Sequence, residues 1–109
     1  MADFDVWLTR GAQIDLEALY GFMKDNRSAD QADVLLDRLL AAIETLEISP
    51  LRGSVPKELD ALGIREFRQI LVEPYRLIYR VGGMTVFVMV IADGRRDMQA
   101  LLERRFLGS

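Results

Sequence analysis

The apolar positions of the first fifty residues follow the period of one strand and then of two helices. Residues 4–9, Phe-Asp-Val-Trp-Leu-Thr, are rich in aromatic and β-branched side chains and predict a strand. Apolar residues then recur every three or four positions across residues 12–23 and again across residues 32–46. This spacing places each set on one face of a helix, so the pattern predicts two amphipathic helices.

The predicted helices have recognisable boundaries. Thr9 is placed to cap the first helix, and Ser28 with Gln31 three positions later has the form of a capping box for the second. The turn-prone residues 25–27 separate the two helices, and Ser49-Pro50 ends the second, because a residue that precedes proline avoids the helical conformation. The pattern therefore predicts a helical hairpin.

The second half of the chain reads as strands. After a loop over residues 51–63 that holds at most one helical turn, strands are predicted at 64–72, 75–81 and 85–91. Gly82-Gly83 is expected to form the two-residue turn between the last two strands, since both glycines accept a positive φ. Residues 85–91 are apolar on both faces, which is typical of a central strand covered from both sides.

A last helix is predicted at the end of the chain, and it completes the fold. Asp97 is placed to cap this helix, Met98, Leu101, Leu102 and Arg105 share one of its faces, and Gly108 ends it. The order β-α-α-β-β-β-α predicts one α+β domain over residues 1–109. In this domain the helical hairpin packs on one face of an antiparallel sheet, and the far side of the sheet displays guanidinium groups to a macromolecule.

The residue types that the chain lacks restrict its chemistry. There is no cysteine and no histidine, so disulfides, thiolate nucleophiles, imidazole bases and the usual zinc sites are excluded. No cofactor or metal is expected. The acidic residues Asp3 and Asp5 do not suit a signal peptide, and no apolar run is long enough to cross a membrane, so we expect a cytoplasmic protein without a membrane partner.

Charge is distributed unevenly along the chain. Residues 1–47 contain ten acidic and four basic residues, whereas residues 48–109 contain seven acidic and ten basic ones, within a net charge of −3. Positive potential is therefore expected only in the second half, as a local cationic patch. The alternative is that these arginines only keep the surface soluble.

Four segments, in order along the chain, resemble the RelE/ParE toxin superfamily. They are the start of the first helix at residues 12–16, Leu46 with Pro50-Leu51-Arg52-Gly53, the strand Tyr75-Arg76-Leu77-Ile78-Tyr79-Arg80-Val81, and Gly94-Arg95-Arg96-Asp97. The resemblance covers nearly the whole chain. It implies a growth-inhibiting toxin of a type II toxin–antitoxin system, bound in a hetero-oligomeric complex by an antitoxin whose C-terminal segment wraps the toxin.

The superfamily has two known activities: RelE-like members cleave mRNA in the ribosome, and ParE-like members inhibit DNA gyrase. Of the residues that RelE-like enzymes use, Arg76 and Arg96 match the two arginines. Phe67 and Gln69, or Arg68 and Ile70 after a shift of one residue, stand where two lysines are expected, and Leu102 replaces the tyrosine of the last helix. Arginine stays protonated and is a poor proton-transfer group, so the resemblance favours the ParE-like activity.

Glu58 stands near the place of a glutamate used by a third group of members, which pair it with a C-terminal histidine or tyrosine. The end of this chain has neither residue, so Glu58 is interpreted as a loop carboxylate in water. Arg76 and Arg96 have a structural alternative too, in ion pairs with Glu66 or Asp97. Tyr75 and Tyr79 are expected to pack on the sheet. Three aspartates on one face of the second helix, Asp30, Asp33 and Asp37, are interpreted as a solvated surface and not as a metal site.

The resemblance and the missing proton-transfer groups favour a ParE-like toxin that acts by binding and has no active site of its own. The resemblance alone implies that its target is DNA gyrase. The expected target-binding residues are Arg76, Arg95, Arg96, Arg104 and Arg105. One alternative is a ribosome-dependent mRNA endonuclease that uses Arg76, Arg96 and Arg68. The other is a degenerate protein that retains only antitoxin binding. The antitoxin is expected to lay an apolar segment on the sheet or along the helical hairpin, with acidic groups that meet the arginines.

Overall fold

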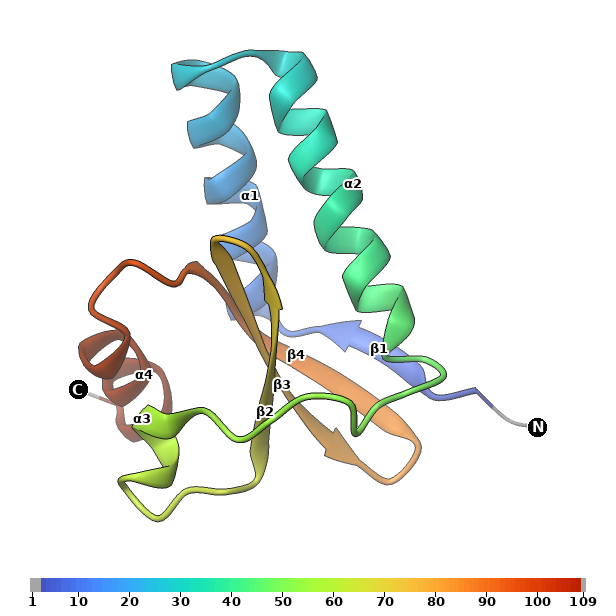
Figure 1. The fold of residues 1–109 in the computed structure, drawn as a ribbon, viewed down its shortest axis with the longest axis vertical. Coiled ribbons are helices and arrows are strands. Elements are labelled where there is room, and N and C mark those ends of the chain that lie inside the picture. Colours follow the sequence, from blue (N-terminus) through green and yellow to red (C-terminus); the bar gives the residue numbers. More distant parts are fainter. Residues whose placement is uncertain (1–2, 109) are drawn as a thin grey trace.

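The computed structural model describes residues 3–108, and the predicted order of elements is confirmed (Figure 1). The helical turn allowed in the predicted loop is present as the short helix α3. The elements are β1 (Asp5–Leu8), α1 (Arg10–Asn26), α2 (Ala29–Thr45), α3 (Lys57–Asp60), β2 (Phe67–Val72), β3 (Tyr75–Gly82), β4 (Thr85–Asp93) and α4 (Met98–Leu107).

The four strands form one sheet in the order β1-β4-β3-β2. The antiparallel meander of β2, β3 and β4 is confirmed, and the apolar strand β4 is central as predicted. The sheet is not wholly antiparallel, however, because β1 pairs with β4 in parallel. The helical hairpin connects β1 to the rest of the sheet, and a crossover of this kind returns the chain in the same direction.

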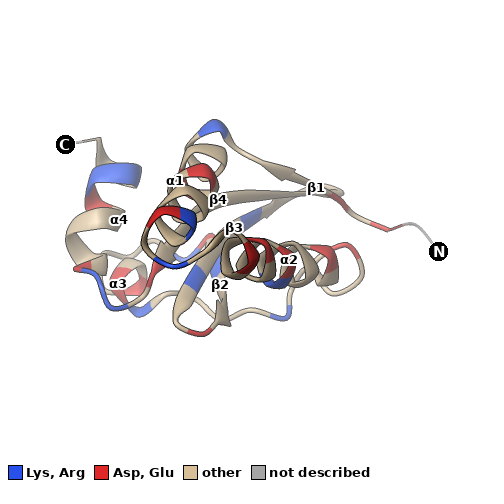
Figure 2. Ribbon diagram, turned by 90° about the horizontal axis from the view of Figure 1, so that it is seen from above, with Lys and Arg blue, Asp and Glu red and all other residues tan. Residues whose placement is uncertain are grey.

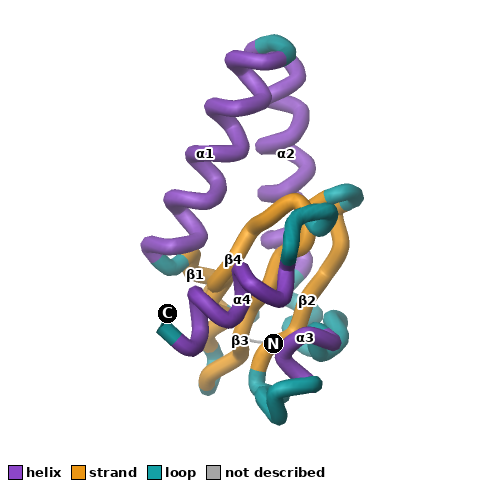
Figure 3. Tube along the Cα trace, turned by 90° about the vertical axis from the view of Figure 1, so that its left-hand side faces the viewer, coloured by secondary structure: helices purple, strands orange, loops and turns teal. Residues whose placement is uncertain are grey.

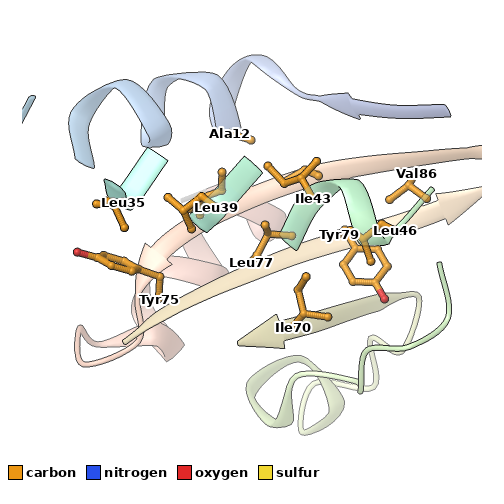
Figure 4. Packing of buried hydrophobic residues seen from close by; sticks show 12 residues of the cluster. Ala12, Leu35, Leu39, Ile43, Leu46, Ile70, Tyr75, Leu77, Tyr79 and Val86 are labelled. Carbon is orange, nitrogen blue, oxygen red and sulfur yellow. The ribbon is translucent and has the colours of Figure 1, made fainter. Parts of the chain in front are cut away.

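One face of the sheet is covered by α1 and α2. Leu35, Leu39 and Ile43 of α2 pack over Leu77 and Tyr79 of β3, as the close view of the core shows (Figure 4). All five side chains are buried, and burial of apolar area is the main stabilising contribution in such a core. The first residues of α1 and the last residues of α2 lie over the sheet, whereas the end of the hairpin that joins them projects beyond it (Figures 1 and 3).

Part of the opposite face is covered by α3 and α4, and this placement was not predicted from the sequence. Ile78 and Val90 from the sheet form a second buried cluster with Leu59 of α3 and with Leu101 and Leu102 of α4. A β-bulge between β3 and β4 lets Ile78 pair with Val90 and Tyr79 with Val88, so β4 has one extra residue. The expectation that this face displays guanidinium groups is therefore wrong for the part of the sheet beneath these helices.

The helix caps are as predicted, and several boundaries differ. Thr9, Ser28 and Asp97 each accept a backbone N–H at their helix start, although no reciprocal bond from Gln31 to the Ser28 amide is found within residues 3–108. The strand predicted from residue 64 begins at Phe67. The tight turn is Gly83-Met84 and not Gly82-Gly83, because Gly82 pairs with Thr85 and only Gly83 has a positive φ.

Candidate functional site

Arg76, the best match to the superfamily pattern, lies in a polar cluster beneath the loop that contains α3. Its NH1 and NH2 groups donate to the two carboxylate oxygens of Glu58, each at 2.8 Å, and its Nε donates to Oε1 of Gln69 at 2.8 Å. The side chains of Arg76 and Glu58 are only 11% and 9% exposed. Both edges of the guanidinium plane are therefore occupied within the chain.

The cluster fixes the charge of Glu58. The hydrogen bonds from Arg76 are the main reason that the pKa of Glu58 lies below its usual value, against a smaller opposing effect of burial. Glu58 is therefore a buried, ionised partner of Arg76, and the interpretation as a solvated loop carboxylate is wrong. Arg76 does form a structural ion pair, but with Glu58 and not with Glu66 or Asp97.

Gly94 is required by the course of the Arg76 side chain. A Cβ atom at this position would lie 2.9 Å from Cδ of Arg76 and 3.2 Å from the carbonyl oxygen of Pro74. No real Cβ atom approaches another carbon so closely without displacing it. The glycine of the Gly94-Arg95-Arg96 segment thus gives the Arg76 stem the room to reach Glu58.

Two further arginines are held by the chain itself. Arg68 donates to the carbonyl oxygens of Leu51 and Gly53 and so ties the loop after α2 to β2. Arg105 pairs with Asp15 of α1 and also donates to the carbonyl oxygens of Gly11 and of Met89, the extra residue of the bulge. Asp15 accepts the Ile91 amide next to this bulge at 3.0 Å. These bonds fasten α4 to α1 and β4.

Arg95, Arg96, Arg104 and Arg105 are the predicted site arginines that remain exposed, although Arg105 is engaged as described above. Arg95 forms an ion pair with Asp93, and this pair is the main reason that the pKa of Asp93 is lowered. Arg96 and Arg104 are separated by most of α4, and eight residues of helix span about 12 Å. The basic residues lie at both ends of this helix (Figure 2), so the structure does not bring all the predicted arginines into one patch.

The positions that carry proton-transfer groups in RelE-like enzymes are apolar or occupied here. Phe67, Ile70 and Leu102 are buried in the two cores, and Gln69 is the partner of Arg76. Tyr79 is buried and accepts the Gly53 amide at 3.0 Å, and burial is the main reason that its pKa is raised. The prediction that the strand tyrosines pack on the sheet is confirmed, since Tyr75 and Tyr79 both belong to the main core.

A shallow apolar groove opens beside the projecting end of the helical hairpin. It has a volume of about 350 Å³, and Met23, Val34, Leu35, Pro74 and Tyr75 form its apolar walls, with polar contributions from Asp30, Gln31 and Arg38. Val34 at its rim and Phe22 on the adjoining helix are 59% and 67% exposed. Clustered exposed apolar side chains of this kind commonly mark a protein-binding surface.

The acidic face of α2 has no structure typical of a metal site. Asp30, Asp33 and Asp37 are exposed, and Asp33 accepts a hydrogen bond from the Tyr20 hydroxyl at 2.7 Å. Within residues 3–108, no three carboxylates lie close enough together to hold a metal ion. The helices of this part of the chain also include none that is long and apolar enough to cross a membrane.

The chain is a small α+β protein in which a helical hairpin and a C-terminal helix pack on a four-stranded sheet. Two solved structures share this fold. The chromosomal ParDE toxin–antitoxin system of P. aeruginosa aligns with a TM-score of 0.69 at 19% identity, covering 83% of this chain and 95% of that one. The toxin–antitoxin complex RelBE2 of Mycobacterium tuberculosis aligns with a TM-score of 0.62 at 22% identity, covering 85% and 93%.

Sequence comparison assigns the family. Residues 6–98 match the family described as ParE toxin of type II toxin-antitoxin system, parDE. Toxin ParE3 of Caulobacter vibrioides is 28% identical over 97 residues, which cover 89% of this chain and 93% of that protein. The chain therefore belongs to the ParE toxin family of type II toxin–antitoxin systems, and the resemblance drawn from its motifs is confirmed.

Sequence reasoning missed several residues that shape the site. Gln69 was noted only as a missing lysine, and Asp93 and Asp15 were not singled out, although they hold Arg76, Arg95 and Arg105 respectively. Asp93 lies two residues before Arg95, so its pairing was open to prediction from spacing. The Arg105–Asp15 pair joins residues 90 positions apart, and no local pattern indicates it.

Proposed function

We propose that this protein is a toxin that inhibits DNA gyrase by binding, without an active site of its own. In the cytoplasm a cognate antitoxin holds it inactive in a hetero-oligomeric complex. The ParE family match over residues 6–98 supports the toxin assignment. The observation that carries the choice of binding over catalysis is the enclosed Arg76–Glu58 pair.

RNA cleavage needs cations to hold the phosphate and groups to move protons. The guanidinium of Arg76 has no free edge for a phosphate, because one edge donates to both carboxylate oxygens of Glu58 and its Nε donates to Gln69. Leu102 and Phe67 offer no proton-transfer chemistry where the superfamily nucleases have it. These observations disfavour the RelE-like alternative.

The target-binding surface is assigned to the exposed arginines around α4. Arg95, Arg96 and Arg104 have accessible guanidinium groups, whereas Arg105 is largely engaged by Asp15 and backbone carbonyls. Arg76 contributes indirectly, because its pairing with Glu58 holds the loop that contains α3 against the sheet. In this proposal Arg96 and Arg104 make the direct contacts with the target.

The antitoxin surface is assigned to the groove at the projecting end of the helical hairpin. Its walls are mainly apolar, and Val34 at its rim is largely exposed. An amphipathic segment of a partner binds such a groove through regularly spaced apolar side chains. The structurally similar ParDE and RelBE2 proteins are toxin–antitoxin systems, and this supports the expectation that the partner is an antitoxin.

Expression without the antitoxin, followed by assays of the purified protein, tests the proposed target. We expect DNA damage in cells and inhibition of gyrase supercoiling in vitro. Rapid arrest of translation with cut mRNA would instead establish the ribosome-dependent endonuclease, and harmless expression of a folded protein would establish a degenerate antitoxin-binding protein.

The proposed target surface is tested by Arg96→Ala combined with Arg104→Ala. Both side chains are exposed, so the variant should fold normally and lose toxicity by at least about tenfold, as loss of charged contacts at an interface does. Arg65→Ala removes one charge from an exposed pair with Asp60 and is the matched control. Full toxicity of the double variant would exclude this surface.

The proposed antitoxin surface is tested by Val34→Asp. A carboxylate at the rim of an apolar groove should weaken co-purification with the protein encoded next to the gene, while the toxin itself stays folded because Val34 is exposed. Leu62→Asp, in the exposed turn after α3, is the control. Unchanged binding by Val34→Asp would place the antitoxin elsewhere.

A further inference from the structure

The outer edge of β1 is an open strand edge. β1 is the terminal strand of the sheet and pairs only with β4. The amides of Asp5 and Thr9 donate to the carbonyl oxygens of Met84 and Val88, and so point toward β4. Because successive residues of a strand direct their backbone groups to opposite sides, the amide and carbonyl of Val6 and the amide of Leu8 point away from β4. At one end of this outer edge the Phe4 amide donates to the backbone carbonyl of Glu47, and at the other end the Gln13 side chain donates to the Leu8 carbonyl. The outward backbone groups of Val6 lie between these two bonds.

The only tryptophan of the chain stands beside this edge. Trp7 is 63% exposed and pairs in register with Phe87 of β4. Arg80 of β3 lies over the Phe87 ring, 4.8 Å from its centroid. The three side chains form a row across the sheet face that the hairpin leaves free, since residues paired across strands share a face. Trp7 ends this row at the open edge.

Carboxylates surround the same edge. A hollow of about 430 Å³ is lined by Asp3, Phe4, Asp5, Val6, Trp7 and Glu47. No ion pair among the described residues neutralises Asp5 or Glu47, and Asp5 shares the face of Trp7 because the two residues are two positions apart in a strand. Figure 2 shows acidic segments along the start of β1 and at the end of α2.

From this arrangement we propose that the outer edge of β1 binds an extended, basic segment of another protein as an added fifth strand. The backbone of that segment pairs with Val6 and Leu8. Its lysine or arginine side chains lie on the face of Asp5 and Trp7, where an aliphatic stem covers the indole and the cation meets the carboxylates. Its alternate residues are apolar, because on the other face they meet the partly buried Val6 and Leu8 at the margin of the main core.

Charge argues against a second copy of this chain as the occupant. Pairing of two β1 edges would bring Asp3, Asp5 and Glu47 of one copy close to the same carboxylates of the other. Like charges placed across a strand pair destabilise it. The surface also lies at the opposite end of the hairpin from the groove assigned to the antitoxin, so the inference does not depend on the proposed function.

The test uses the whole protein and a labelled peptide of about seven residues that alternates lysine with valine, a length typical of one strand. We expect saturable binding in fluorescence anisotropy below about 1 mM, weakened by salt, together with a change in Trp7 emission. A glutamate–valine peptide tests the charge requirement and a lysine–proline peptide tests backbone pairing, since proline cannot donate to a strand edge.

Matched variants assign the site. Asp5→Lys should weaken binding of the lysine–valine peptide at least about tenfold, whereas Asp25→Lys, which makes the same charge change at the far end of α1, should not. Circular dichroism controls for folding, and Val6→Lys serves as a second edge variant if Asp5→Lys unfolds. Absence of peptide binding, equal binding of the glutamate or proline peptides, equal effects of the two charge variants, or self-association of the protein through this edge would overturn the proposal.

Discussion

The buried pair of Arg76 and Glu58 allows one prediction to be worked out in detail. Replacing Arg76 with Met keeps the length of the side chain but leaves the carboxylate of Glu58 buried without its partner. Both side chains are about nine-tenths buried, and removing one member of such a pair costs about 3–5 kcal/mol. Since a domain of this size is typically stable by about 5–15 kcal/mol, the variant should lose a large fraction of its stability.

A double-mutant cycle separates the pair from its context. The free energy of unfolding is measured in urea at pH 7 for the wild type, Arg76→Met, Glu58→Leu, and the double variant that carries both changes. The double variant replaces two charges with apolar side chains of similar size, so it should be more stable than Arg76→Met by at least about 2 kcal/mol. A loss below about 1 kcal/mol in Arg76→Met, or simple additivity in the double variant, would refute the reasoning.

The same pair makes a prediction about pH. The pKa of Glu58 is lowered in the folded state from its usual value of 4.5, so its contribution is complete above that value and is lost as the pH falls through the folded pKa. The stability difference between the wild type and Glu58→Gln should therefore be largest at neutral pH and shrink below about pH 4.5. A difference that stays constant down to pH 2 would contradict an ionised, paired Glu58.

Three further changes test other contacts, all by urea unfolding with circular dichroism. Gly53→Ala would place a Cβ atom 2.5 Å from the Gln69 carbonyl oxygen and should destabilise the protein by about 1–3 kcal/mol. Gly21→Ala lies in helix α1 with no neighbour within 4 Å and should instead stabilise it by about 0.5–1 kcal/mol, so equal effects of the two would disprove the packing argument. Arg105→Ala should cost about 1–2 kcal/mol, because Asp15 loses its cationic partner and keeps only the Ile91 amide, and the Met89 carbonyl at the bulge loses the Arg105 donor. Wild-type stability of Arg105→Ala would show that α4 is held by its apolar face alone.

Local patterns in the sequence determined the elements of this protein. The period of apolar residues predicted both long helices, and Thr9, Ser28 and Asp97 marked their starts, since caps act through hydrogen bonds over three residues. The double-faced apolar run at 85–91 predicted a central strand, because only burial on both sides favours such a composition. The ordered motifs were enough to indicate the toxin superfamily.

The availability of the arginines was decided by tertiary structure alone. Whether a guanidinium is free depends on which acceptors the folded chain brings to it, and those acceptors lie far away in the sequence. Glu58 stands 18 residues from Arg76 and Asp15 stands 90 from Arg105. The placement of β1 at the sheet edge and of α4 on the face opposite the hairpin is likewise a matter of packing between distant segments. Composition fixed how many cations this toxin has, and only the fold determined which of them remain free to bind.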